Sequence, residues 1–159
     1  MRKSLFVLML PVAVLVMAPA VMAEEPEKPW FDMVNCEFCK HLMDDPELLN
    51  HTTWEHFNIT NGIINVTTVD KEYLDSYHAA GEEMMKVGKR LMDGEKVQMC
   101  GSCRAHGTLI QAGAKMEHIE TQRGHVMLVT SDNPEMVAKI QAWAKRNIDE
   151  LAKLEAREK

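Results

Sequence analysis

Apolar and polar residues alternate along two stretches of the chain, as expected for β-hairpins with one buried face. The first hairpin is predicted over residues 54–69 around Asn61-Gly62, a pair favoured in type I′ turns, and the second over residues 116–131 around Arg123-Gly124. Counting outward from the first turn pairs Ile59 with Ile64 and Phe57 with Val66. The predicted buried face therefore consists of Phe57, Ile59, Ile64 and Val66, joined by Ile119, Val126 and Leu128 of the second hairpin.

The opposite face of the first hairpin is predicted to be polar and partly wet, because it carries His56, Asn58, Asn65 and Thr67.

Apolar residues recur at helical spacing after each hairpin. Asp70 is expected to cap a helix over residues 71–92 that ends at Gly94, and Asp132 is expected to cap a last helix. Shorter helices are predicted from Asn35 and over residues 105–114. The buried stripe predicted for the last helix consists of Val137, Ile140, Ala144, Ile148, Leu151 and Leu154.

The two halves of the chain align without a gap at an offset of 62 residues, which matches His56 with His118 and Gly62 with Gly124. This predicts an internally duplicated unit: a C-x-x-C helix, a β-hairpin and a second helix. Two such units would form an α+β fold with a four-stranded antiparallel sheet and helices packed mainly on one face. A pseudo-twofold arrangement of this kind can bring the two cysteine motifs together.

The N-terminus has the pattern of a secretory signal peptide, with Arg2 and Lys3 before an apolar run and small residues up to Ala23. We therefore expect a cleaved signal peptide over residues 1–23 and a lead-in segment over 24–34. A single domain would cover 35–155, as two pseudo-repeats of about 35–95 and 99–155, before a frayed tail at 156–159. The expected location is periplasmic or extracellular, without a stable membrane span after signal removal.

Removing Arg2 and Lys3 leaves 16 basic residues against 24 acidic ones, a formal charge of −8. Nucleic acid is therefore not expected as a partner. The chain also lacks the sequence motifs of serine hydrolases, zinc proteases and nucleotide-binding proteins, so a non-enzymatic role is favoured.

All four cysteines lie in two motifs, Cys36-Glu37-Phe38-Cys39 and Cys100-Gly101-Ser102-Cys103, each followed by a cation, Lys40 or Arg104. At a helix start, both sulfurs of such a motif lie near backbone N–H groups that favour thiolates. Four thiolates are the ligand set of a structural zinc site. The predicted metal ligands are therefore Cys36, Cys39, Cys100 and Cys103, with His56 and His118 as candidate additional ligands.

Copper(I) is the second metal to consider, because soft sulfur ligands select it and the mature chain is rich in methionine. Export favours disulfides instead, and then no cofactor is expected. Two further readings stay open: a thiol-disulfide exchange protein with a thiol partner, and an interaction module whose cysteines are structural. Haem attachment is not expected, since no histidine follows the second cysteine of either motif.

Overall fold

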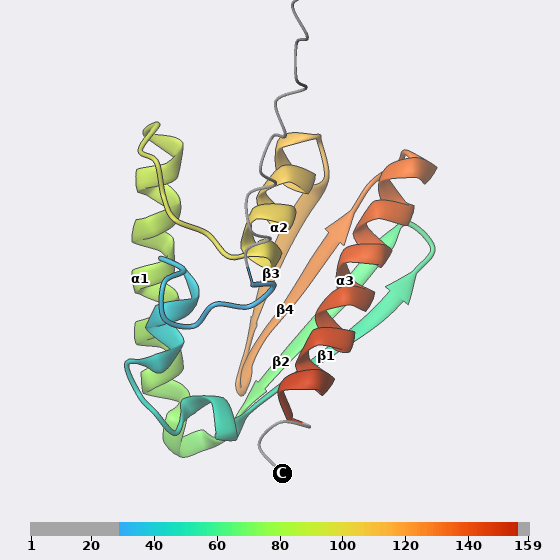
Figure 1. The fold of residues 1–159 in the computed structure, drawn as a ribbon. Coiled ribbons are helices and arrows are strands. Elements are labelled where there is room, and N and C mark those ends of the chain that lie inside the picture. The colour runs from blue at the N-terminus through green and yellow to red at the C-terminus, as the bar shows by residue number, and fades with distance from the viewer. Residues whose placement is uncertain (1–28, 156–159) are drawn as a thin grey trace, which may run out of the picture.

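The computed structural model describes residues 29–155, which form an α+β fold with a four-stranded antiparallel sheet and three α-helices (Figure 1). The predicted signal peptide, the lead-in up to residue 28 and the predicted tail lie outside the described residues. The strands are β1 (Thr52–Ile59), β2 (Gly62–Val69), β3 (Lys115–Thr121) and β4 (Gly124–Thr130). The α-helices are α1 (Leu74–Met92), α2 (Gly101–Gln111) and α3 (Pro134–Glu155), and the 3-10 helices are η1 (Cys39–Met43), η2 (Leu48–His51) and η3 (Lys71–Tyr73).

The two hairpins pair through β2 and β4, which gives the strand order β1-β2-β4-β3. Each hairpin turn lies one residue earlier than predicted: Thr60-Asn61 connects the paired Ile59 and Gly62 in the first. The predicted type I′ turn at Asn61-Gly62 is wrong, because it needs positive φ at Asn61 and no described residue other than glycine has it. The strands therefore pair Phe57 with Ile64 instead of with Val66.

At Gly62 and Gly124, the backbones of β2 and β4 leave no room for a side chain. A Cβ atom at Gly62 would lie 2.0 Å from the carbonyl oxygen of Val129, and one at Gly124 would lie 2.3 Å from that of Thr67. Both glycines also have positive φ, which side chains rarely adopt. These two residues therefore permit the central strand pairing.

The predicted buried face of the sheet is wrong. Phe57 and Ile119 are 50% and 47% exposed, whereas Ile63 and Val129 on the opposite face are fully buried. The reason is that α3 packs on that opposite face, where Ile63 and Val129 contact Ile140 (Figure 1). We call this helix-covered side the inner face. Asn65 and Thr67, predicted to be partly wet, are also buried on it.

The pairing registers repeat at the offset of 62 residues found in the sequence. Glu55 pairs with Val66 in the first hairpin, and Glu117 pairs with Leu128 in the second. The central pair Asn65–Met127 also joins two residues separated by that offset. The helices that follow the two hairpins do not repeat in this way. Helix α3 contacts β1, β2 and β4, whereas α1 contacts mainly η1 and η3.

The predicted helix from Asn35 is wrong, because that segment is a turn followed by the 3-10 helix η1, and Asn35 itself donates to Asp32. Helix α1 ends before Gly94, whose φ is +87°, in agreement with the predicted stop. The cap of α3 is Asn133 rather than Asp132, because its Oδ1 accepts from the N–H of Glu135 at 2.9 Å.

The buried stripe of α3 is rotated relative to the prediction. Ile140 and Ala144 are buried as predicted, but Ile148 and Leu154 are 47% and 38% exposed. The residues that complete the stripe instead are Met136, Trp143 and Asn147.

Candidate metal centre

The two cysteine motifs meet at the start of α2. Cys36 and Cys39 come from the N-terminal segment, with Cys39 opening η1, whereas Cys100 is the N-cap of α2 and Cys103 lies in its first turn. Backbone hydrogen bonds join these segments: the N–H of Glu37 donates to Gln98, and the N–H of Gly101 donates to Pro29. Segments more than 60 residues apart are thus held side by side.

The four sulfur atoms all lie within 4.8 Å of one another. The Sγ of Cys39 is 3.8 Å from that of Cys100 and 3.5 Å from that of Cys103. A tetrahedral zinc ion with Zn–S bonds of about 2.3 Å places its sulfurs about 3.8 Å apart. A disulfide needs sulfurs at about 2.05 Å, and all four cysteines are free thiols. The cluster therefore has the dimensions of a metal site.

The cysteine cluster is largely shielded from solvent. Cys36 and Cys100 are 0% and 2% exposed, and Cys39 is 9% exposed, with Met33 and Phe38 packed against the cluster. A buried group of four neighbouring thiolates repels itself strongly unless a cation is present. The structure thus positions four buried cysteines to hold a metal ion.

In each motif the pKa of the first thiol is lowered and the pKa of the second is raised. A hydrogen bond with Cys100 lowers the pKa of Cys36, and one with Cys103 lowers the pKa of Cys100 to about 6. Hydrogen bonds with Cys100 raise the pKa of Cys39 and of Cys103. The physical reason is that each ionised sulfur makes ionisation of its neighbours less favourable. Full ionisation of the cluster requires a cation, whose binding would release protons.

Lys40 and Arg104, the cations after the two motifs, are not the main cause of the thiol pKa shifts. The ammonium of Lys40 pairs with Glu37 at 3.0 Å, and Arg90 also binds Glu37 at 3.2 Å. Arg104 lies exposed on α2 and lines a groove on the side of α3. The neighbouring thiols, rather than these cations, are the largest cause of every thiol pKa shift.

The two candidate histidines lie on the inner face of the sheet, outside the group of ligand atoms that lie within 4.8 Å of one another. His56 accepts a hydrogen bond from Asn65 at 2.7 Å, and burial lowers its pKa. His118 is exposed, with its ring 5.4 Å from that of His125. His56 and Cys39 nevertheless line one cavity of about 200 Å³, together with Met33 and Met127.

A hydrogen-bond network holds the first turn of α2, and little in the sequence pattern predicts it. Asn147, 5% exposed on α3, accepts hydrogen bonds from Ser102 and Trp30 at 2.8 Å each. The indole N–H of Trp143 donates to the carbonyl of Ser102 at 3.3 Å. An asparagine at a helical spacing from Ile140 and Trp143 was the only available signal.

Fold and site together define an α+β protein with a buried cluster of four cysteines. Comparisons with protein-family models, curated proteins and solved structures found no match to this chain. Among the helices of residues 29–155, none is long and apolar enough to cross a membrane.

Proposed function

We propose that this is an exported, non-enzymatic protein that binds a thiophilic metal ion through Cys36, Cys39, Cys100 and Cys103, with zinc favoured over copper(I). The observation that carries the proposal is the mutual approach of four sulfurs to within 4.8 Å, three of them on buried cysteines and the fourth on the partly exposed Cys103. Four thiolates around zinc supply apparent binding energies on the order of 10 kcal/mol or more at neutral pH. A disulfide between the motifs would supply about 4 kcal/mol.

Zinc is favoured because the Cys39–Cys100 separation of 3.8 Å matches the edge of a zinc–thiolate tetrahedron. Copper(I) has a weaker argument in its favour: Met33 packs against the cluster and lines the cavity onto which Cys39 opens. Thioethers are soft ligands that select copper(I) over zinc.

We also infer that the chain arose by duplication of a unit of about 62 residues, with its helices mainly on one face of the sheet. The repeated registers and the equivalent roles of Gly62 and Gly124 support this inference. The contact of Tyr77 in α1 with His125 on the inner face supports the helix placement. Duplication explains why each half contributes one C-x-x-C pair to a single centre.

The alternative from another class is thiol-disulfide exchange. One observation favours it: the hydrogen bond with Cys103 lowers the pKa of Cys100, which favours the thiolate form of this sulfur. Burial opposes it, because an attacking sulfur must reach its partner and Cys100 is 2% exposed. A third reading is an interaction module with structural cysteines.

The test is to purify the protein from its native compartment and measure free thiols and bound metal in the same sample. We expect one metal ion per chain and four thiols that react only after chelation. Cobalt(II) substitution should give the absorption of a tetrahedral thiolate site. Four oxidised cysteines with no metal would contradict the proposal.

Two sets of variants separate the readings. Each single Cys→Ser change is expected to weaken zinc binding strongly, while Met33→Leu preserves zinc and weakens copper(I). For exchange with Cys100 as the attacking sulfur, Cys103→Ser is the trap, because it removes the neighbouring thiol that would resolve the mixed disulfide, and recovery of a mixed disulfide with this variant would favour that alternative.

A further inference from the structure

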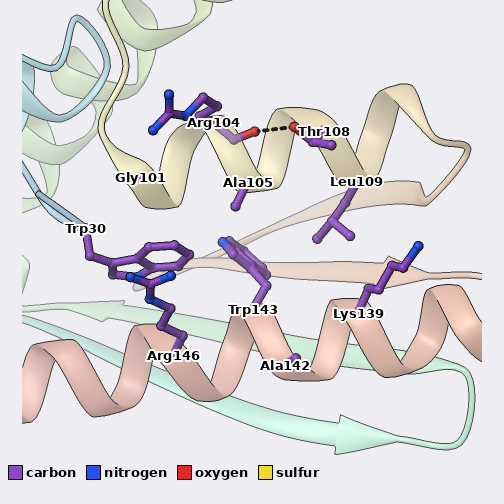
Figure 2. Close-up of a pocket in the computed structure, with 10 residues that line it drawn as sticks. All are labelled: Trp30, Gly101, Arg104, Ala105, Thr108, Leu109, Lys139, Ala142, Trp143 and Arg146. Carbon is purple, nitrogen blue, oxygen red and sulfur yellow. Dashed lines mark hydrogen bonds between the residues drawn. The ribbon is translucent and has the colours of Figure 1, made fainter. Parts of the chain in front are cut away.

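A groove of about 540 Å³ lies between α2 and α3, and Gly101 and Arg104 of the first turn of α2 line one end of it (Figure 2). Figure 2 shows the side chains of Trp30 and Trp143 pointing into the space between the two helices, with Ala105 and Leu109 facing them from α2. This volume and this apolar lining are typical of sites for small organic molecules.

The charged groups of the groove are of one sign. Arg104 comes from α2, Lys139 and Arg146 come from α3, and no carboxylate of residues 29–154 lines the groove. Arg104 and Lys139 form no ion pair with any residue of the described part of the chain. This is a notable arrangement in a chain with 24 acidic and 18 basic residues, where carboxylates are the more abundant partners. The groove is therefore a local site of positive potential on an acidic protein.

The aromatic side chains of the groove are held in place. The indole N–H of Trp30 donates to Asn147 at 2.8 Å, and the guanidinium of Arg146 lies 3.9 Å from the centre of the Trp30 ring. Trp143 is 9% exposed and stacks on His106 with ring centres 4.9 Å apart. Because the indoles are fixed, a ligand loses little binding energy in ordering them.

We propose that this groove binds a small organic anion: a carboxylate or phosphate group attached to a flat apolar body. Lys139 binds the anionic group at the end of the groove beside Leu109, the charge of Arg104 adds to the positive potential around the groove, and the apolar body packs against Trp30, Trp143 and Leu109. Charge complementarity and the mixed lining carry the proposal. It does not rest on the metal centre, although both use the first turn of α2.

The experiment uses phenyl phosphate and benzoate as the two probes. Inorganic phosphate, which has the anionic group without a ring, and benzyl alcohol, which has a ring without a charge, are the control compounds. Binding is followed by NMR of the three indole N–H groups, before and after chelation of metal. We expect saturable binding of at least one aromatic anion that shifts Trp30 and Trp143 but not Trp54, which lies on β1 outside the groove. Inorganic phosphate and benzyl alcohol are expected to bind at least about tenfold more weakly. Tighter binding of phenyl phosphate than of benzoate would indicate a phosphate ligand, and the reverse order would indicate a carboxylate.

The matched variants reverse a charge inside and outside the groove on the same helix. Lys139→Glu is expected to weaken binding about tenfold or more, while Lys153→Glu, which alters an exposed residue paired with Glu150, leaves it within about twofold. Arg104→Gln is the second groove variant, and circular dichroism checks that each variant folds. Equal affinity of wild type and Lys139→Glu, equal shifts at Trp54, or the absence of saturable binding would overturn the proposal.

Discussion

Gly101 is the residue at which the metal centre and the groove meet. A Cβ atom there would lie 2.9 Å from the Trp30 ring and 3.2 Å from the Cα of Trp30, closer than side chains normally pack. The glycine lets the N-terminal segment lie against α2, so that Trp30 lines the groove and the cysteine motifs meet. Gly107 in the same helix has nothing within 4 Å of its would-be Cβ.

We therefore predict opposite effects of the same substitution at these two positions. Gly101→Ala should lower the free energy of unfolding by about 1–3 kcal/mol, because the added methyl must displace Trp30. Gly107→Ala should raise it by about 0.5–1 kcal/mol through helix propensity alone. Denaturant unfolding measures both. A stabilising Gly101→Ala would show that the contact with Trp30 does not constrain the backbone.

A second single residue, His125, is expected to make the free energy of unfolding depend on pH. Burial lowers its pKa, and its Nδ1 shares a hydrogen bond with the hydroxyl of Tyr77. Because the unfolded histidine binds protons at higher pH than the folded one, stability is present above the unfolded pKa of about 6.5 and is lost as pH falls below it.

Replacing His125 by Gln keeps an acceptor and removes the titration. The free energy of unfolding of metal-free protein should then fall less steeply between about pH 7 and 5 than in wild type. His78→Gln, on the exposed side of α1, is the matched control. An unchanged slope for His125→Gln would contradict the assignment.

At the scale of elements, strand β2 shows why the buried face of the sheet was predicted wrongly. Ile63 and Val69 lie on one face of β2, and Ile64 and Val66 lie on the other, so alternation alone is equally consistent with either being buried. The inner face looked polar because Asn65 and His56 lie on it, but these two side chains bond to each other. The deciding factor is α3, whose contact with the sheet is a tertiary property.

Ile63 and Ile64 are adjacent residues of the same type, so they make a matched pair. Ile63→Ala should cost about 2–5 kcal/mol of unfolding free energy, since Ile63 is fully buried against α3. Ile64→Ala, on the half-exposed outer face, should cost less than about half as much. Thermal or denaturant unfolding compares them directly. The reverse order would restore the face assignment made from the sequence.

At the scale of the whole molecule, the element types were predictable because both hairpins and the helices α1 and α3 carry strong local patterns. The expected symmetry of the two halves allowed Cys36 and Cys39 to meet Cys100 and Cys103 but did not require it, and the element after Cys36 is a 3-10 turn instead of an α-helix. The groove was missed because its lining comes from three separate segments, and no local spacing records how they meet.

In the proposed metal-bound state the ion ties the N-terminal segment to α2, which gives the last prediction. Without the metal, the attachment depends on a few bonds, such as those of Glu37 to Gln98 and Gly101 to Pro29. The sheet and α3 have a separate core around Ile63, Val129 and Ile140. Loss of metal should therefore loosen one region before the other.

Chelation should raise amide hydrogen exchange most in residues 29–51 and at the start of α2, while β2 and β4 stay protected. Added zinc should restore protection, and Cys103→Ser should show the loosened pattern even with zinc present. Hydrogen exchange read by mass spectrometry resolves these segments. A uniform rise that includes β2 and β4 would mean that the metal supports the fold as a whole. An unchanged pattern would mean that the cysteine cluster does not hold these segments together.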